Sequence, residues 1–328
     1  MSDVIVSSRV RLARNYEDLP FQEKMTAGQA AECAARTLAA LRETPESYRY
    51  VPLSAASAQD KTALQESHLI SADLMRREDI GAALIRADER LSIMMNEEDH
   101  LRLQAIFPGE SLDQAAQAVF AVEEAVQAKF AFAFDEQLGY LTACPTNTGT
   151  GMRASALLHL PMLRLLKQMG KVNQLAAKLG LTLRGVYGEG SEARGCLYLM
   201  SNQATLGQSE QELLQSVSAM ARKLAEMEDA LRARAMERRD ISLEDQIFRA
   251  YGLCANARRM PIGEFMAHWS SLRLGAALGL LPLTTAQCDA LLTAAQPAHV
   301  ERSAGRRLTA QEQDEERSRV IRGAIQGG

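Results

Sequence analysis

The segment CPTNTGTGMRAS, residues 144–155, decides which class of nucleotide-binding fold the chain can adopt. Its Gly149, Gly151 and Ala154 satisfy the pattern G-x-G-x-x-A, which indicates a dinucleotide site when it joins a strand to a helix. That site needs an acidic residue about 20 positions further on, but residues 137–188 contain neither Asp nor Glu. A Walker A loop is excluded as well, because the segment lacks the sequence Gly-Lys-Ser/Thr.

The surroundings of this segment favour an anion site of another kind. The window 137–188 contains six basic residues and no acidic one. Its glycines leave backbone N–H groups accessible, and a helix starting here would add the positive end of its dipole. We therefore expect a helix over residues 154–169, kinked at Pro161, with Arg153 in its first turn. The alternative is a plain helix N-terminus capped by Thr150.

The composition is that of an ordinary globular protein with room for two domains. The chain has 328 residues, of which 47% are hydrophobic and 24% charged. Its net charge of −4 argues against a dedicated nucleic-acid binder. The five cysteines are scattered without a CxxC pair, and the arginine-rich start does not resemble a signal peptide. We therefore expect a cytoplasmic protein that has no direct contact with nucleic acid or a membrane.

The pattern along the chain predicts an α+β domain over residues 1–225, followed by a helical domain over 226–328. The expected strands are residues 3–7, 90–95, 138–143, 181–187 and 195–200. The expected helices, besides 154–169, are residues 112–132 and 209–240, with more helix towards the end. Long helical segments between strands also suit a parallel sheet, so the strand directions stay open.

Charged residues recur at the ends of these predicted elements. If residues 4–11 form a strand, Arg9 and Arg11 point to the same face, and two adjacent guanidinium groups need a multivalent anion between them. The alternative is a solvated edge strand. In NEEDHLR, residues 96–102, a helix would place Glu98 and Arg102 on one face, and the alternative is an acidic first turn.

A glycine-rich segment, residues 184–195, carries Arg184 and Glu189. Such a segment can close over a ligand, or it can be a simple hairpin connection. The chain thus offers five arginines for phosphate and two well-placed carboxylates. Phosphoryl transfer needs cations around the phosphates. Carboxylates near the phosphates suit this reaction only if the acceptor is itself a cation, and a guanidinium meets that condition.

Four ordered motifs resemble the phosphagen (ATP:guanido) kinases, most closely the bacterial protein-arginine kinase (McsB-like) branch. They are SSRVRLARN (7–15), NEEDHLR (96–102), CPTNTGTGMRAS (144–155) and RGVYGEGSEARG with SNQATLG (184–207). The resemblance implies an antiparallel β-sheet flanked by helices, followed by an α-helical C-terminal domain. It also implies the use of ATP and Mg²⁺, the ion bridging the nucleotide phosphates without dedicated protein ligands.

The resemblance assigns roles to individual residues. Glu98 is the catalytic base, Glu189 clamps the substrate guanidinium, and Cys144 is a reactive cysteine beside it. The ATP phosphates are held by Arg9, Arg11, Arg102, Arg153 and Arg184. Arg194 stands where the family leads us to expect an apolar residue.

The resemblance further implies that the acceptor is an arginine side chain of a protein, marked for Clp protease degradation under stress. Only six residues precede Ser7, so we expect no N-terminal domain enclosing a small substrate. A small-guanidine phosphagen kinase and a non-catalytic phosphoarginine-binding regulator are the alternatives. The expected partners are a McsA-like zinc-finger activator, the Clp unfoldase–protease and a second copy of the chain.

The C-terminal tail departs from the protein-arginine kinase pattern. Where relatives carry Arg-Asp-x-x-Arg-Ala, this chain has the run QDEERS at residues 313–318. Asp314 and Arg317 remain from the motif as a degenerate phosphoarginine-binding pair.

Overall fold

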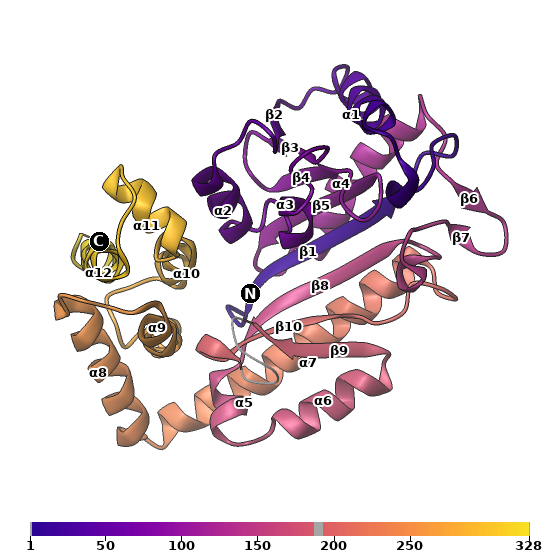
Figure 1. The fold of residues 1–328 in the computed structure, drawn as a ribbon. Helices are drawn as coiled ribbons and strands as arrows, with labels where there is room; N and C mark the ends of the chain where they lie inside the picture. Colours follow the sequence, from indigo (N-terminus) through magenta and orange to yellow (C-terminus); the bar gives the residue numbers. More distant parts are fainter. Residues whose placement is uncertain (1, 187–192, 328) are drawn as a thin grey trace.

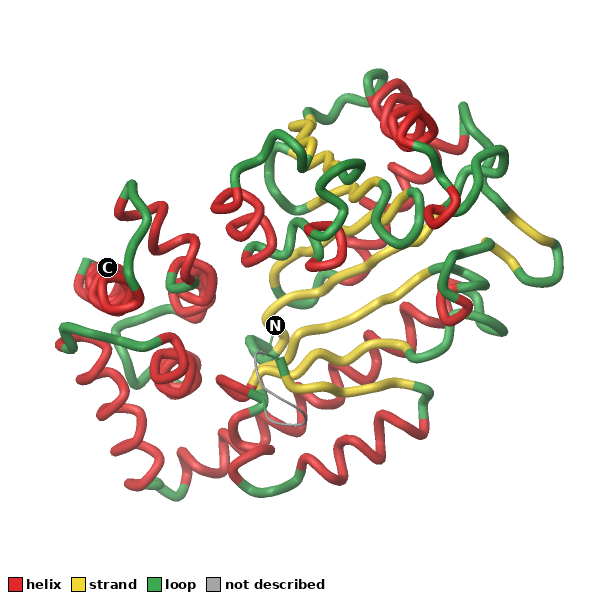
Figure 2. Tube along the Cα trace, in the orientation of Figure 1, coloured by secondary structure: helices red, strands yellow, loops and turns green. Residues whose placement is uncertain are grey.

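The computed structural model describes residues 2–186 and 193–327. In these residues a large sheet carries long helices on one face and the short α2 and α3 on part of the other, and a group of helices from the C-terminal part lies beside one end of it (Figures 1 and 2). The eight strands of the sheet run in the order β2-β3-β4-β5-β1-β8-β10-β9, and each neighbouring pair is antiparallel. The antiparallel fold that the resemblance implies is therefore confirmed, and a parallel sheet is excluded.

The strands of this sheet are β1 (Ile5–Arg14), β2 (Tyr48–Pro52), β3 (Ala82–Arg86), β4 (Leu91–Met95), β5 (Leu101–Pro108), β8 (Met152–His159), β9 (Leu181–Gly185) and β10 (Leu197–Asn202). A separate hairpin consists of β6 (Phe134–Asp135) and β7 (Gly139–Tyr140). The helices of the sheet domain are α1 (Ala27–Leu41), α2 (Ala58–Glu66), α3 (Ala72–Met75), α4 (Leu112–Gln127), α5 (Pro161–Leu165), α6 (Met169–Lys178) and α7 (Glu210–Glu237). The C-terminal helices are α8 (Ile241–Asn256), α9 (Ile262–Ala277), α10 (Thr285–Ala294), α11 (Pro297–Ala304) and α12 (Ala310–Gln326).

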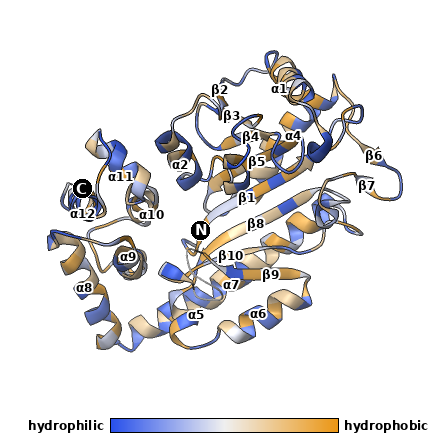
Figure 3. Cartoon of the chain, in the orientation of Figure 1, coloured by the Kyte–Doolittle hydropathy of each residue, from blue (hydrophilic) through white to orange (hydrophobic). Residues whose placement is uncertain are grey.

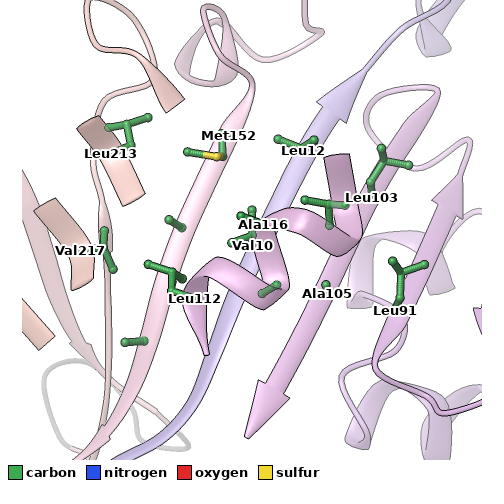
Figure 4. Close-up of a cluster of buried hydrophobic side chains, with 14 of the residues drawn as sticks. Val10, Leu12, Leu91, Leu103, Ala105, Leu112, Ala116, Met152, Leu213 and Val217 are labelled. Atoms are coloured by element: carbon green, nitrogen blue, oxygen red, sulfur yellow. The ribbon is translucent and has the colours of Figure 1, made fainter. Parts of the chain in front are cut away.

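Alternating residues in β1 give the sheet two different faces. Val10 and Leu12 are fully buried and point towards α4 and α7, where they meet Ala116 and Val217 in the main core (Figure 4). Arg9 and Arg11 alternate with them and point to the opposite face. Hydrophilic segments accordingly interrupt the central strands β1 and β8 in Figure 3. One face of the sheet is thus the main core, while the other carries arginines on its central strands and a smaller apolar cluster under α2 and α3 on β2–β4.

The predicted helix over residues 154–169 is wrong. Residues Met152–His159 form strand β8, which lies between β1 and β10, and α5 begins only at Pro161. The proline occupies the first turn of the helix, where its missing N–H needs no partner, so it starts a helix and kinks none. Ala and Leu favour helices, but Met152, Ala154, Ala156 and Leu158 alternate with Arg153 and Ser155, which is the period of a strand with one face in the core.

Three smaller expectations also need correction. The motif at residues 96–102 is a turn followed by β5, so no helix places Glu98 and Arg102 on one face. The helix predicted to reach residue 132 ends at Gln127. Of the predicted strand 138–143, only Gly139–Tyr140 is strand.

The long helix expected over residues 209–240 is present as α7, and its start is fixed by a capping box. Ser209 accepts a hydrogen bond from the Glu212 backbone N–H, while the Glu212 side chain accepts one from the Ser209 N–H. The domain boundary proposed at residue 225 lies inside this helix. Leu213 packs in the sheet core, and Ala235 packs in a second core formed mainly by the C-terminal helices around Trp269.

The C-terminal helices also contact the sheet domain through α2. The Glu66 carboxylate accepts hydrogen bonds from the backbone N–H groups of Ala298 and His299, at 3.1 and 3.3 Å, and so caps α11. Arg302 adds an ion pair with Asp60 at 2.9 Å. The helical region is therefore held against the sheet domain. Over the described ranges, no helix is long and apolar enough to cross a membrane.

Candidate active site

Strand register brings the predicted phosphate-binding arginines to one face of the sheet. Arg11 lies directly opposite Arg153 on β8, and Ala13 lies opposite Arg102 on β5. Directly opposed residues of an antiparallel pair share a face, so Arg102 and Arg153 join Arg9 and Arg11. Arg184 on β9 shares this face through its partner Leu199, and it is exposed. We call Arg9, Arg11, Arg102, Arg153 and Arg184 the arginine face.

Arg153 reaches this face from a strand and not, as expected, from the first turn of a helix. Its Nε and Nη2 atoms donate to the Ser201 hydroxyl at 3.3 and 3.1 Å. The helix N-terminus that was expected to bind an anion here does not exist. The anion-binding capacity of this segment therefore lies in the arginine side chain.

The charges on the arginine face repel one another. Burial, together with Arg102 and Arg153, lowers the pKa of Arg9 to about 9, although Glu97 opposes the shift. Burial and the neighbouring Arg9, Arg102 and Arg153 lower the pKa of Arg11 well below its ordinary value. The guanidinium groups of Arg9 and Arg11 remain cations at neutral pH. A cluster of this kind is destabilising unless an anion lies within it.

The face also holds unsatisfied donors. Within the described ranges, the Nε atoms of Arg9 and Arg102 are buried without a hydrogen-bond partner. Both residues line a cavity of about 400 Å³ that extends to α2 and to Gln296 at the start of α11. Buried N–H groups normally find partners. The cavity and its donors therefore fit the phosphates of a nucleotide.

Glu97 is a site residue that the sequence did not single out. Both of its carboxylate oxygens contact Arg102 Nη1, at 2.7 and 2.9 Å, and the Ser71 hydroxyl donates to the same carboxylate. Glu97 is 4% exposed, so this is a buried ion pair that holds the guanidinium in one orientation. The Glu-Glu pair in the motif was the available signal, but it did not show which glutamate faces which partner.

The turn that carries Glu97 and Glu98 is fixed by a hydrogen-bond network. The Asp99 carboxylate accepts from Asn15 Nδ2 and from the backbone N–H of Ala143, both at 2.7 Å. Asn15 Oδ1 in turn accepts from the His100 N–H at 2.8 Å. His100 Nε2 donates to the Pro20 carbonyl at 2.8 Å, and burial lowers the pKa of this imidazole. Asp99 and His100 therefore build the turn that aims the two glutamates.

Glu98 lies beside the arginine face. It shares a small cavity with Arg11, Arg102 and Arg153. Burial and the nearby carboxylate of Asp99 raise its pKa, while a hydrogen bond from the Cys144 thiol lowers it. A carboxylate with a raised pKa that is still open to a ligand is suited to accept a proton. The structure thus brings together Glu98 and Cys144, which are 46 positions apart in the sequence.

We predict that Cys144→Ala moves the acidic limb of the pH–rate profile to higher pH. The thiol donates to the Glu98 carboxylate and stabilises its charged form, so its removal raises the pKa of Glu98. The fraction of deprotonated base at a given acidic pH then falls. The profile of kcat/KM from pH 5 to 9 measures this shift. Cys144→Ser retains a donor and should shift the limb less; an unmoved limb in the alanine variant contradicts the assigned contact.

The glycines of the 144–155 segment allow close packing of the backbone. Gly149 has φ +114° and Gly151 φ +60°, values that favour glycine. A Cβ on Gly149 would collide with the Thr205 carbonyl oxygen, and one on Gly151 would lie 2.6 Å from Arg14 Nη1. Arg14 is fully buried and pairs with Glu123 at 2.6 Å. The glycine pattern therefore lets three backbone segments meet closely.

The remaining predicted residues lie elsewhere. Glu189 is outside the described residues. Arg317 is buried among the C-terminal helices, where its guanidinium contacts the carbonyls of Ala295 and Met260 and the Asp314 carboxylate at 2.7, 2.9 and 2.6 Å. Arg317 and Asp314 thus hold α12 against its neighbours. Their proposed binding of phosphoarginine stays a prediction.

The arginine face with Glu98 at its edge defines a phosphoryl-transfer site that takes a nucleotide and a cationic acceptor. The chain belongs to the ATP:guanido phosphotransferase family, whose C-terminal catalytic domain model matches residues 29–231. A second model, the protein-arginine kinase McsB C-terminal domain, matches residues 240–327. The chain is an ATP-dependent kinase.

Known proteins resemble the chain over nearly its full length. A protein-arginine kinase of Symbiobacterium thermophilum is 41% identical over 99% of this chain and 94% of its own length. Another, from Brevibacillus brevis, is 40% identical over 98% of this chain and 91% of its own length. Among solved structures, a lombricine kinase has a TM-score of 0.61 and 27% identity, covering 70% of this chain and 67% of its own. The guanidino-kinase fold is confirmed.

Proposed function

We propose that the protein is a protein-arginine kinase, which transfers the γ-phosphoryl group of ATP to arginine side chains of proteins and yields phosphoarginine. The observation that carries this proposal is the Glu98 carboxylate beside the arginine face, with its raised pKa and its Cys144 contact. The names of the full-length relatives support the choice of a protein acceptor over a small guanidine.

The chemistry follows from the positions of the charges. A guanidinium nitrogen of the acceptor attacks the γ-phosphorus, an N–P bond forms, and the P–O bond to ADP breaks. Glu98 accepts the proton that the nitrogen loses, which leaves the product free of an unfavourable positive charge next to the new bond. Arg9, Arg11, Arg102 and Arg153 stabilise the charge on the phosphates. In this scheme Glu189 would grip the opposite side of the acceptor guanidinium.

Mg²⁺ is proposed to arrive with the nucleotide. Among the described residues, no group of three or more His, Cys, Asp or Glu side chains could hold a metal ion. Mg²⁺ would therefore enter with the nucleotide and would neutralise charge on its phosphates, next to the arginine face.

The cellular role is proposed from the family resemblance. The phosphorylated proteins would be substrates of a Clp unfoldase–protease, and a McsA-like zinc-finger protein would activate the kinase. A homodimer and a cytoplasmic location belong to the same proposal, which the five free cysteines support because thiols stay reduced in that compartment. We also propose that residues 1–225 form the catalytic domain and residues 226–328 the helical domain.

The proposal is tested by offering ATP with either free arginine or an unfolded arginine-rich protein. We expect an acid-labile phosphate on the protein, located on arginine by mass spectrometry under conditions that preserve N–P bonds. Labelling of free arginine alone would show a small-guanidine kinase. The absence of labelling on both acceptors, with phosphoarginine binding retained, would show a non-catalytic regulator.

A further inference from the structure

An apolar groove adjoins the active site through the 144–151 segment. Asn147 and Gly151 of this segment line the cavity that holds Glu98, while Gly149 and Thr150 line a second cavity of about 350 Å³. The second cavity lies between the β6–β7 hairpin and residues 205–210. In Figure 1 the hairpin projects from the end of the sheet where β7 leads towards β8. We call this second cavity the hairpin groove.

The walls of the hairpin groove expose large apolar side chains. Phe134 is 59% exposed, Leu138 47% and Leu206 54%, and all three line the groove. A single exposed apolar side chain is ordinary, whereas several that gather in one groove indicate a binding surface.

The hairpin is held in place by a chain of contacts that ends in the core. The Phe134 ring meets Tyr140 edge to face at 5.2 Å, and the Tyr140 ring lies 3.5 Å below the Arg14 guanidinium. Arg14 is anchored in turn by its buried ion pair with Glu123. At the tip, the Asp135 carboxylate accepts hydrogen bonds from the backbone N–H groups of Gln137 and Leu138, at 2.8 and 2.9 Å. The apolar wall is therefore pre-organised before a partner arrives.

The floor of the groove is backbone, and its rim is acidic. A Cβ on Gly139 would collide with the main chain of Gly149, and one on Gly149 would collide with the carbonyl oxygen of Thr205, so the glycines let these backbone segments pack closely. The tip of the hairpin places Asp135 and Glu136 in solvent next to the apolar wall. Apolar walls with an acidic rim suit a segment that carries both apolar and basic side chains.

We propose that the hairpin groove binds the polypeptide segment that flanks the acceptor arginine of a substrate protein. The inference rests on the proposed function, because a free amino acid has no flanking chain to bind. Residues of the 144–151 segment line both cavities, so a chain seated in the groove lies beside a segment that also lines the Glu98 cavity. The groove thereby favours extended segments of unfolded proteins, which expose apolar and basic residues together.

The test compares protein and small acceptors in groove variants. Phe134→Ser and Leu206→Ser should each raise KM about tenfold for reduced and alkylated lysozyme as the unfolded acceptor. The values of kcat, of KM for ATP and of kcat/KM for N-acetylarginine amide should stay within about twofold, because the groove holds only flanking chain. Phe248→Ser is the matched control, since this phenylalanine is 51% exposed on α8, outside the groove. Unchanged circular dichroism in all three variants verifies folding.

Two outcomes contradict the proposal at different levels. If the wild type phosphorylates the unfolded protein and both groove variants keep its KM, the groove is not a docking site although the kinase assignment stands. If the wild type phosphorylates only free arginine, the proposed function fails and the groove proposal falls with it. An equal rise of KM in Phe248→Ser would show a general effect of losing surface apolar area, and it would also contradict the docking role proposed for the hairpin groove.

Discussion

Glu98→Gln is expected to lower kcat by about 10² to 10⁴-fold, the usual contribution of a general base. Glutamine keeps the size and a hydrogen-bonding oxygen of the side chain, but it cannot accept the proton that the acceptor guanidinium loses. KM for ATP should change little, because the phosphates are held by the arginines. Initial rates of phosphoarginine formation, measured at saturating ATP and protein, give the comparison.

The pH dependence separates a proton acceptor from a side chain that only positions substrate. Burial and Asp99 raise the pKa of Glu98, so the wild-type rate should fall with decreasing pH at a higher pH than an ordinary glutamate would cause. In Glu98→Gln this acidic limb should disappear from the residual rate. Glu237→Gln, at the exposed end of α7, is the control and should leave the profile unchanged. A persisting limb in Glu98→Gln would assign the titration to another group.

Thermal stability provides an independent check on the same variant. The raised pKa means that the fold disfavours the charged form of Glu98, so the neutral glutamine should not lower the melting temperature at pH 7. A stability loss would indicate that the glutamate is structural and that the fall in rate reflects misfolding.

The sequence predicted the arginine face better than it predicted the strand beside it. Arg9 and Arg11 alternate with buried Val10 and Leu12, and this period of two is visible in a single segment. In β8 the same period is present, since buried Met152, Ala154, Ala156 and Leu158 alternate with Arg153 and Ser155, but the helix propensity of Ala and Leu prevailed in the interpretation. The antiparallel direction of the strands came only from the family resemblance, because pairings between distant segments leave no local signal.

The hydrogen bonds that hold the turn with Glu97 and Glu98 also join distant segments, so local sequence patterns could not predict them. Asp99 is held by Asn15 and by the backbone of Ala143, from segments 84 and 44 positions away. Ser71, which contacts Glu97, comes from yet another segment. The sequence showed that residues 96–102 were unusually polar, but the division into scaffold and reactive groups required the three-dimensional contacts. The carboxylates of Glu97 and Asp99 are bound by other residues of the protein, whereas the Glu98 side chain is exposed and can meet the acceptor.

Arg11→Met is expected to lower kcat/KM for ATP by about 10² to 10³-fold, the loss typical of removing one group that stabilises developing charge. The same substitution should raise the melting temperature of the nucleotide-free protein by about 2 °C, the order expected for 1 kcal/mol. Burial and the charges of Arg9, Arg102 and Arg153 lower the pKa of Arg11, so its charge opposes folding at neutral pH. Methionine fills similar space without the charge.

Thermal melts with and without ATP separate the two effects. The wild type should gain stability on adding ATP, because the phosphates neutralise the arginine face, whereas Arg11→Met should gain much less. Arg234→Met, on the exposed side of α7, controls for a change in net charge and should melt like the wild type in both conditions. If Arg11→Met melts below the wild type without nucleotide, the packing of the Arg11 side chain stabilises the fold more than its charge repulsion destabilises it. If it keeps full activity, Arg11 does not bind phosphate. The expected combination, a more stable and inactive enzyme, would show that the arginine face is maintained for its ligand at the expense of the fold.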